Sequence, residues 1–165
     1  KASFKTAMRH RRALIPASGF YEWRRSGDKK SQAYWIRPRN GGIIAFAGLY
    51  EPWANAEGSE MDTGAILTTR ANDDIRHIHD RMPVVIEQKD FARWLDCKTQ
   101  EPRHVADLMK PAQPDFFEAV PVSDKVNKVA NTGPDIQERV LENLREPKKS
   151  TRNKPEEPDR QMKLF

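Results

Sequence analysis

The chain has 165 residues, of which 37% are hydrophobic and 32% are charged, a polar composition that still allows one folded domain. No apolar run approaches the length of a membrane-spanning helix, and residues 1–12 are basic and lack the apolar stretch of a signal peptide. The single cysteine, Cys97, excludes an internal disulfide and fits a reducing cytosol. We expect it to be a half-buried residue at a helix end rather than a reactive thiol.

The net charge of +5 is unevenly distributed along the chain. Residues 1–39 hold eleven Lys or Arg and two Asp or Glu, whereas residues 40–144 have a net charge of −7 and residues 145–165 a net charge of +3. If the positive charge gathers on one face it suits a phosphate backbone; a solvated basic surface is the simpler alternative. Tyr21, Trp23, Tyr34 and Trp35 are interleaved with this charge, and that mixture favours single-stranded nucleic acid.

In chain order, the pattern predicts a helix over residues 1–11 and a strand over residues 19–23. A turn signal at 26–29 and a strand over 32–37 complete a hairpin. After a turn at 40–42, further elements are indicated by apolar runs, with strands expected at 43–50, 64–69, 83–86 and 116–122 and short helices at 90–96 and 102–109. Strands at short intervals with few helices indicate an α+β fold with mainly antiparallel strands.

The composition changes near residue 144. Residues 145–160 contain Pro147, Pro155 and Pro158 among charged and polar residues, and such a segment buries too little apolar surface to stay folded. The prediction is therefore one domain over residues 1–144 and a disordered basic tail over residues 145–165.

Glu22 is the first candidate for chemistry. Period-2 alternation places Phe20 and Glu22 on one face of their strand and Tyr21 and Trp23 on the other. A carboxylate beside aromatic groups loses solvation, which raises its pKa and suits it to acid–base work. An exposed strand glutamate paired with an arginine is the alternative.

His79 is the second candidate, because it precedes a strand and can exchange protons at physiological pH. Arg81 could hold a phosphate, and the hydroxyl of Thr68 could position a substrate oxygen. The alternatives are that His79 is an ordinary hydrogen-bonded polar residue and that Thr68 is an ordinary β-branched strand residue. His77 and His79 form an H-x-H pair, yet no second cluster of ligands accompanies them, so no metal site and no cofactor is predicted.

Several strings resemble one family in content and order: Leu-Ile-Pro-Ala-Ser-Gly-Phe-Tyr-Glu-Trp at 14–23, Ala-Gly-Leu-Tyr-Glu at 47–51, Ile-Leu-Thr-Thr at 66–69, Ile-His-Asp-Arg-Met-Pro at 78–83 and Pro-Val-Ser at 121–123. They are similar to the SRAP domain, the SOS response-associated peptidase family. The resemblance covers about residues 1 to 140. It implies a barrel-like, mainly antiparallel fold with a few short flanking helices.

The resemblance also implies an activity. SRAP proteins remove their own initiator methionine, and the exposed N-terminal cysteine forms a thiazolidine cross-link with the aldehyde of an abasic site in single-stranded DNA. By resemblance, Glu22 is the acid–base carboxylate and His79 handles sugar hydroxyl protons, which also supports a lyase step. Thr68 lines the site, and Trp23 and Arg81 lie near the bases and backbone. A monomeric, cytoplasmic, nucleoid-associated DNA-repair protein is implied, with no membrane partner.

The sequence departs from the family in one respect. The cysteine that follows the initiator methionine is absent, as are the Cys-Gly-Arg start and the Asn-Ala-Arg-x-Glu motif, and Cys97 matches nothing in that role. The expectation is that this chain lacks an N-terminal part and forms no thiazolidine by itself.

The tail ends in Gln161-Met162-Lys163-Leu164-Phe165, which resembles the pentapeptide that binds the bacterial sliding clamp. Gln161, Leu164 and Phe165 are the residues that match it.

Two alternatives to the cross-linking function remain open at this point. One is a non-catalytic module that binds single-stranded DNA and the clamp, and the other is a peptidase acting on other proteins, for which no catalytic triad is apparent.

Overall fold

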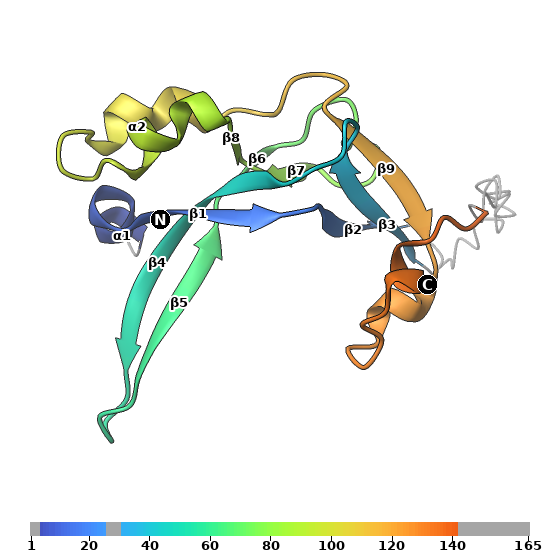
Figure 1. Ribbon diagram of the computed structural model, residues 1–165, viewed down its shortest axis with the longest axis horizontal. Helices are drawn as coiled ribbons and strands as arrows, with labels where there is room; N and C mark the ends of the chain where they lie inside the picture. Colours follow the sequence, from blue (N-terminus) through green and yellow to red (C-terminus); the bar gives the residue numbers. More distant parts are fainter. Residues whose placement is uncertain (1–3, 26–30, 142–165) are drawn as a thin grey trace, which may run out of the picture.

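The computed structural model describes residues 4–25 and 31–141, and the tail with its pentapeptide lies outside them. Within the described residues the strands form a four-stranded, a three-stranded and a two-stranded sheet, and every strand pairing is antiparallel. The helices are short and lie at the edges (Figure 1). The expected α+β class with mainly antiparallel strands is therefore confirmed. In the same part of the chain no helix is long and apolar enough to cross a membrane.

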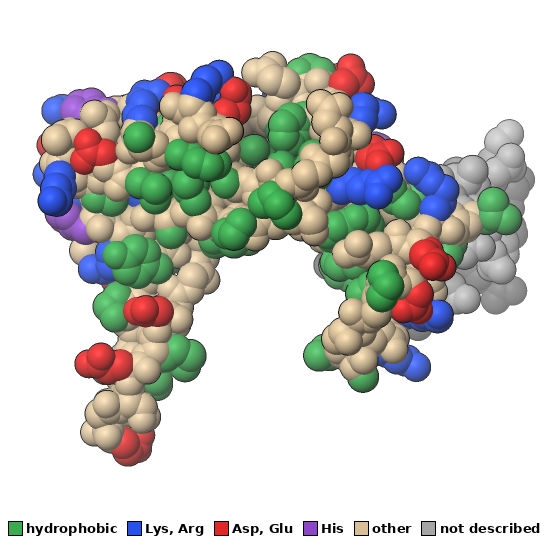
Figure 2. Space-filling model, viewed as in Figure 1, with side chains coloured by type: hydrophobic (Ala, Val, Ile, Leu, Met, Phe, Trp, Pro, Cys, Tyr) green, Lys and Arg blue, Asp and Glu red, His purple; other side chains and the backbone are tan. Residues whose placement is uncertain are grey.

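The four-stranded sheet is built around one long strand, β4 (Ile44–Ala54). It pairs with β1 (Arg12–Ala17), β5 (Glu60–Ile66) and β8 (Val85–Ile86). The first half of β4 is buried because it is flanked by strands on both sides, whereas its second half is largely exposed. That second half and β5 project from the body as a two-stranded ribbon, on which Figure 2 shows acidic side chains.

The three-stranded sheet joins β2 (Phe20–Arg25), β3 (Ser31–Pro38) and β9 (Phe117–Val122). β2 and β3 form the predicted hairpin, with Glu22 opposite Tyr34; its turn falls outside the described residues. β2 begins directly after Gly19, where a Cβ atom would collide with the backbone oxygen of Ile36. Glycine is therefore required where the chain turns from β1 into this sheet.

Two predicted strands are each divided in the structure. Residues 64–69 belong to β5 and to β6 (Thr68–Arg70), and residues 83–86 to β7 (Arg81–Pro83) and β8. The divisions fall at Leu67 and Val84. The Leu67 N–H donates to the Ala47 carbonyl, the Ala47 N–H to the Val84 carbonyl, and the Val84 N–H to the Leu67 carbonyl. The chain changes strand partner at these two residues, so the single-strand predictions were wrong there.

The three predicted helical segments each contain a helix in the structure. Residues 1–11 contain α1 (Lys5–His10), and residues 90–96 contain α2 (Phe91–Leu95). The segment after Pro102 is a 3-10 helix, η3 (Pro102–Leu108), with proline in its first turn as expected. Two further 3-10 helices follow β9, η4 (Asp124–Asn127) and η5 (Pro134–Gln137), and η2 (Gln88–Asp90) precedes α2.

Three apolar clusters hold these elements together. The largest cluster contains residues from all three sheets and from the segment between β6 and β7, among them Ile36, Phe46, Ile75, Met82 and Phe117. A second, around Trp94, packs the helices against β4 and β8. The third lies on the other face of the β2–β3–β9 sheet, around Trp35. The segment from 71 to 80 is thus fixed to the core by buried side chains.

Candidate functional site

Glu22 lies on the face of β2 that turns toward the main core. Phe20, two residues earlier, packs edge-to-face on Phe46 and Phe117, with ring centroids 5.8 and 5.6 Å apart. Alternation places Glu22 on the same face, half-buried and directly opposite Tyr34 of β3. The predicted orientation of this strand is therefore confirmed, and the carboxylate stands at the margin of the core.

Tyr34 connects Glu22 to the segment that carries the histidines. Its ring is buried and meets the ring of His77 edge-on, with centroids 6.5 Å apart. The guanidinium of Arg24 lies 5.4 Å from the centroid of the same ring. Tyr34 and His77, about forty positions apart in the chain, are thus brought together next to the strand that carries Glu22.

The histidine segment is anchored by an acidic side chain, that of Asp74. Asp74 accepts hydrogen bonds from the backbone N–H groups of Asp115 and Phe117, both at 3.1 Å, and from the side-chain amide of Asn72 at 3.0 Å. The Asn72 amide also lies within hydrogen-bonding distance of the backbone oxygens of residues 112 and 113. Asp74 therefore ties the histidine segment to the start of β9.

His79 is held by its neighbour's backbone. The N–H of Arg81 donates to His79 Nδ1 at 3.0 Å. In the neutral ring Nδ1 is then the acceptor, so the proton is on Nε2. The Arg81 carbonyl oxygen and an Asp80 carboxylate oxygen lie 3.2 and 3.4 Å from Nδ1, where they would receive a proton placed on that nitrogen. His79 can therefore offer an Nε2 proton from an exposed ring whose orientation is set by the backbone.

Thr68 and Arg81 form a unit on the two-stranded β6–β7 sheet. The Arg81 guanidinium donates through Nη2 to the Thr68 carbonyl oxygen at 2.6 Å and to its hydroxyl at 2.9 Å, and Nε lies 3.3 Å from the same hydroxyl. Both side chains are exposed. The threonine thus orients the arginine, and the two predicted residues adjoin each other and, through the Arg81 backbone, His79.

Trp23 lies apart from this group. It is on the opposite face of β2 from Glu22, within the cluster around Trp35 and Tyr21, and its indole N–H donates to the side-chain oxygen of Asn127 at 2.9 Å. Trp23 and Glu22 are therefore adjacent in sequence but face opposite sides of the sheet.

The H-x-H pair does not assemble a metal site in the described part of the chain, where no three His, Cys, Asp or Glu residues come together. His77 is instead occupied by its contact with Tyr34. Cys97 follows α2, is half-buried, and belongs to none of the groups described above.

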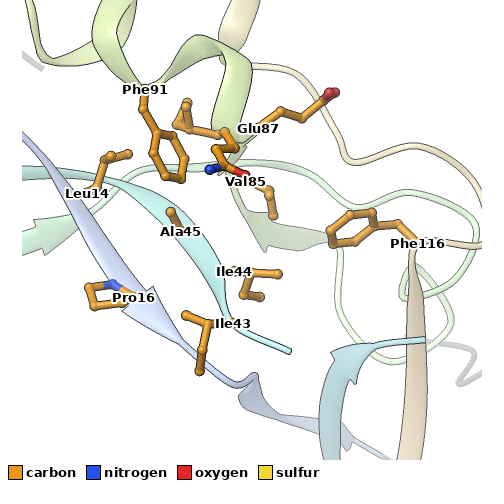
Figure 3. A pocket seen from close by; sticks show the side chains of 11 residues that line it. Leu14, Pro16, Ile43, Ile44, Ala45, Val85, Glu87, Phe91 and Phe116 are labelled. Atoms are coloured by element: carbon orange, nitrogen blue, oxygen red, sulfur yellow. The ribbon is translucent and has the colours of Figure 1, made fainter. Parts of the chain in front are cut away.

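A mostly apolar cavity of the described structure lies elsewhere. It has a volume of about 660 Å³ and lies between β1, β4, β8 and the start of α2 (Figure 3). Its lining is mostly apolar, with Leu14, Ile44, Val85, Phe91 and Phe116 around it, and it includes none of the candidate residues. A cavity with so few polar groups is poorly suited to acid–base chemistry, so the surface around Glu22, His79 and Arg81 remains the candidate site.

The roles of two residues of this surface were not predicted from the sequence. Tyr34 was named only among the aromatic residues interleaved with the basic charge, and its place beside Glu22 follows from the hairpin register. Asp74 stands in an Ala-Asn-Asp-Asp string, which signals a turn but not the distant backbone amides that it binds. Gln161, Leu164 and Phe165 lie outside the described residues.

Known proteins are similar to this chain in sequence and in fold. The family model for SOS response associated peptidase (SRAP) matches residues 1–129. The chain is 38% identical over 138 residues to "Abasic site processing protein YoqW" of Bacillus subtilis, a match that covers 84% of this chain and 62% of that protein. It is 29% identical to "Abasic site processing protein HMCES" of Gallus gallus, covering 82% of this chain and 46% of that one. A crystal structure of a Bacteroides thetaiotaomicron protein superposes with a TM-score of 0.77 at 29% identity, over 86% of this chain and 62% of that one. The chain thus spans about three fifths of the length of these bacterial proteins.

Proposed function

Because the chain belongs to the SOS response associated peptidase family, we propose that it provides the acid–base groups and DNA contacts of an abasic-site processing protein. The observation that carries the proposal is the adjacency, around the Tyr34 ring, of the strand bearing Glu22 and the segment bearing His79. The substrate is single-stranded DNA with an abasic site. The protein acts as a monomer in the cytoplasm, at the nucleoid.

The proposed reaction joins an N-terminal cysteine to the abasic sugar. The amine adds to the C1′ aldehyde of the ring-opened sugar, and the resulting carbinolamine loses water to give an imine. The thiol then adds to the same carbon and its proton passes to the nitrogen, which closes a thiazolidine. The net change is two new bonds at one carbon and the release of one water molecule.

Each proton transfer has a group suited to it. Glu22 accepts a proton from the attacking amine and returns it to the departing hydroxyl. As the sugar ring opens, the C1′–O4′ bond breaks, His79 donates its Nε2 proton to O4′, and the C1′ hydroxyl gives its proton to water, which leaves the aldehyde. Reversal of the cross-link and a lyase-type strand cleavage use the same two groups. Removal of the initiator methionine would place the new amine beside Glu22.

Cys97 follows α2 and belongs to none of the groups around Glu22 and His79, so it does not serve as this nucleophile. We therefore test the proposal with a chimera in which an N-terminal segment beginning Met-Cys-Gly-Arg, the start that the family resemblance implies, is joined ahead of Lys1. The chimera should form an adduct with abasic single-stranded DNA that survives a denaturing gel, and its Cys→Ala version should not.

Two substitutions assign the roles. Glu22→Gln and His79→Ala should each slow adduct formation by about 10²- to 10⁴-fold, the usual contribution of a general acid or base. Asp73→Asn, on an exposed carboxylate that pairs with Arg76, serves as the matched control and should leave the rate unchanged. A chimera that folds and forms no adduct, or whose rate is indifferent to Glu22, would overturn the proposal.

A second proposal concerns the pentapeptide at residues 161–165. It is supported by the Gln-x-x-Leu-Phe pattern alone, which suits a peptide that docks in the groove of a bacterial sliding clamp. The chain should bind purified clamp, and replacing Leu164 and Phe165 by alanine should abolish binding without altering affinity for DNA. Equal clamp binding by both chains would refute it, leaving the DNA proposal intact.

A further inference from the structure

β6 and β7 place two arginines directly opposite each other. In their antiparallel register Arg70 faces Arg81, Thr69 faces Met82 and Thr68 faces Pro83. Cross-strand partners share a face and have Cβ atoms about 4.5–5.5 Å apart. Met82, on the opposite face, is buried in the main core, whereas both arginines are exposed to solvent.

Such a pair is unfavourable unless something neutralises it. Like charges directly opposite each other destabilise a two-stranded sheet. Among the residues that the structure describes, no carboxylate lies within ion-pair distance of either guanidinium. The neighbouring carboxylate of Asp80 lies 3.4 Å from His79, and that of Asp73 pairs with Arg76 at 3.3 Å. Two cations are thus held side by side without an anion.

The two arginines differ in how firmly they are held. The Arg81 guanidinium is oriented by the Thr68 hydroxyl and carbonyl oxygens. Arg70 makes no such hydrogen bond in the described structure, so its side chain can adjust to a ligand. One fixed and one adjustable guanidinium on a single solvent face suit an oxyanion that accepts hydrogen bonds from both, and a phosphate group has three or four oxygens with this capacity.

We propose that Arg70 and Arg81 together form a phosphate clamp, in which Arg70 is a DNA-binding residue beside the reactive site. The ligand is a backbone phosphate of single-stranded DNA, next to the abasic nucleotide that His79 serves. The identity of the ligand as DNA depends on the proposed function. The placement of the two arginines opposite each other depends only on the β6–β7 register. A bound phosphate removes the repulsion between the arginines and fixes the register of the DNA strand relative to His79.

The test measures non-covalent binding of the 165-residue chain to an abasic single-stranded oligonucleotide over a range of salt concentrations. Each phosphate contact adds about 0.7 to the slope of log affinity against log salt for single strands, which corresponds to about fivefold in affinity at 0.1 M salt. Arg70→Ala should therefore bind about fivefold more weakly with a slope reduced by about 0.7. Arg70→Lys should keep most of the slope, because it keeps the charge.

The matched control is Arg103→Ala, which removes the same charge from an exposed arginine of η3 that pairs with Glu101. It should change neither affinity nor slope appreciably. Thermal unfolding gives a second readout, because Arg70→Ala relieves the repulsion and should melt no lower than the unmodified chain. Equal binding by Arg70→Ala and the unmodified chain, or an equal loss in Arg103→Ala, would overturn the clamp while the proposed function stands.

If the chain does not bind the oligonucleotide at all, the result counts against the proposed function. The phosphate clamp of Arg70 and Arg81 would then be tested separately with inorganic phosphate as the ligand. Arginine side-chain N–H resonances would be followed during a phosphate titration. Shifts at Arg70 and Arg81 that spare Arg103 would support the clamp as a phosphate site. Uniform shifts, or none, would overturn it.

Discussion

We expect the substitution Arg12→Met to destabilise the chain strongly, because Arg12 is a buried cation that satisfies four backbone carbonyls. Only 4% of this residue is exposed. Its guanidinium donates to the carbonyl oxygens of Trp94 at 2.6 Å, Asp96 at 2.7 Å, and Met8 and Gln100 at 2.9 Å, and it lies 5.6 Å from the Trp94 ring centroid. One side chain thereby joins α1, β1, α2 and the turn that follows.

The size of the loss can be worked from these contacts. A hydrogen bond from a charged donor contributes about 1.5–3 kcal/mol, so the four bonds would sum to about 6–12 kcal/mol if they were independent. Three of the four are only partly buried, so their carbonyls regain water, and methionine retains much of the packing. Removing the guanidinium also removes the cost of burying it. We therefore expect the free energy of unfolding to fall by about 3–5 kcal/mol.

Urea denaturation followed by circular dichroism would measure this change, and the melting temperature should fall by about 6–20 °C. Arg37→Met is the control, because Arg37 is half-exposed and pairs with Glu118 on the surface. Its effect should stay within about 0.5 kcal/mol. If the two variants unfold alike, the four carbonyl contacts of Arg12 do not contribute to stability and the reasoning fails.

Three further predictions concern the site and the surface. Thr68→Val removes the hydroxyl that orients Arg81 and should weaken binding of single-stranded DNA by about two- to fivefold, whereas Thr68→Ser should not; equal affinities would contradict this. Asp74→Asn should lower the free energy of unfolding by about 1–3 kcal/mol and speed amide exchange at the start of β9, as hydrogen-exchange mass spectrometry would detect. The hydrogen bond from Arg93 lowers the pKa of Asp107, so this carboxylate stabilises the fold above the pKa of the unfolded state and ceases to do so as the pH falls through the lower folded value. The difference in melting temperature between the chain and Asp107→Asn should thus be present at neutral pH and vanish in strong acid, and a difference that persists there would contradict the assignment.

Local periodicity was enough to predict the strand that carries Glu22. Alternation placed Phe20 and Glu22 on one face and Tyr21 and Trp23 on the other, and the aromatic contacts on both faces agree. This worked because side-chain direction in a strand depends on the strand itself. The family strings then selected Glu22 and His79 from the other carboxylates and histidines.

The positions at which the chain changes from one neighbouring strand to another could not be predicted from local periodicity. Leu67 and Val84 interrupt strands that are continuous in the sequence, because the backbone of Ala47 bonds to both of them. The same limit applies to the site, since the role of Asp74 depends on amides some forty residues away. Neither feature has a local signature, because both arise from contacts that form only when distant segments fold together.

The positions of the tryptophans determine what the chain's intrinsic fluorescence can report. All four lie away from the surface that carries Glu22, His79 and Arg81. Trp23 and Trp35 are on the reverse face of the β2–β3–β9 sheet, Trp94 is the buried residue of α2, and Trp53 is on the projecting ribbon. DNA confined to the site surface would therefore leave the emission of the chain nearly unchanged, while unfolding would alter it. Quenching by DNA would mean that the strand passes around the sheet edge to reach Trp23, or along the ribbon to reach Trp53, and single-tryptophan variants would distinguish these two routes.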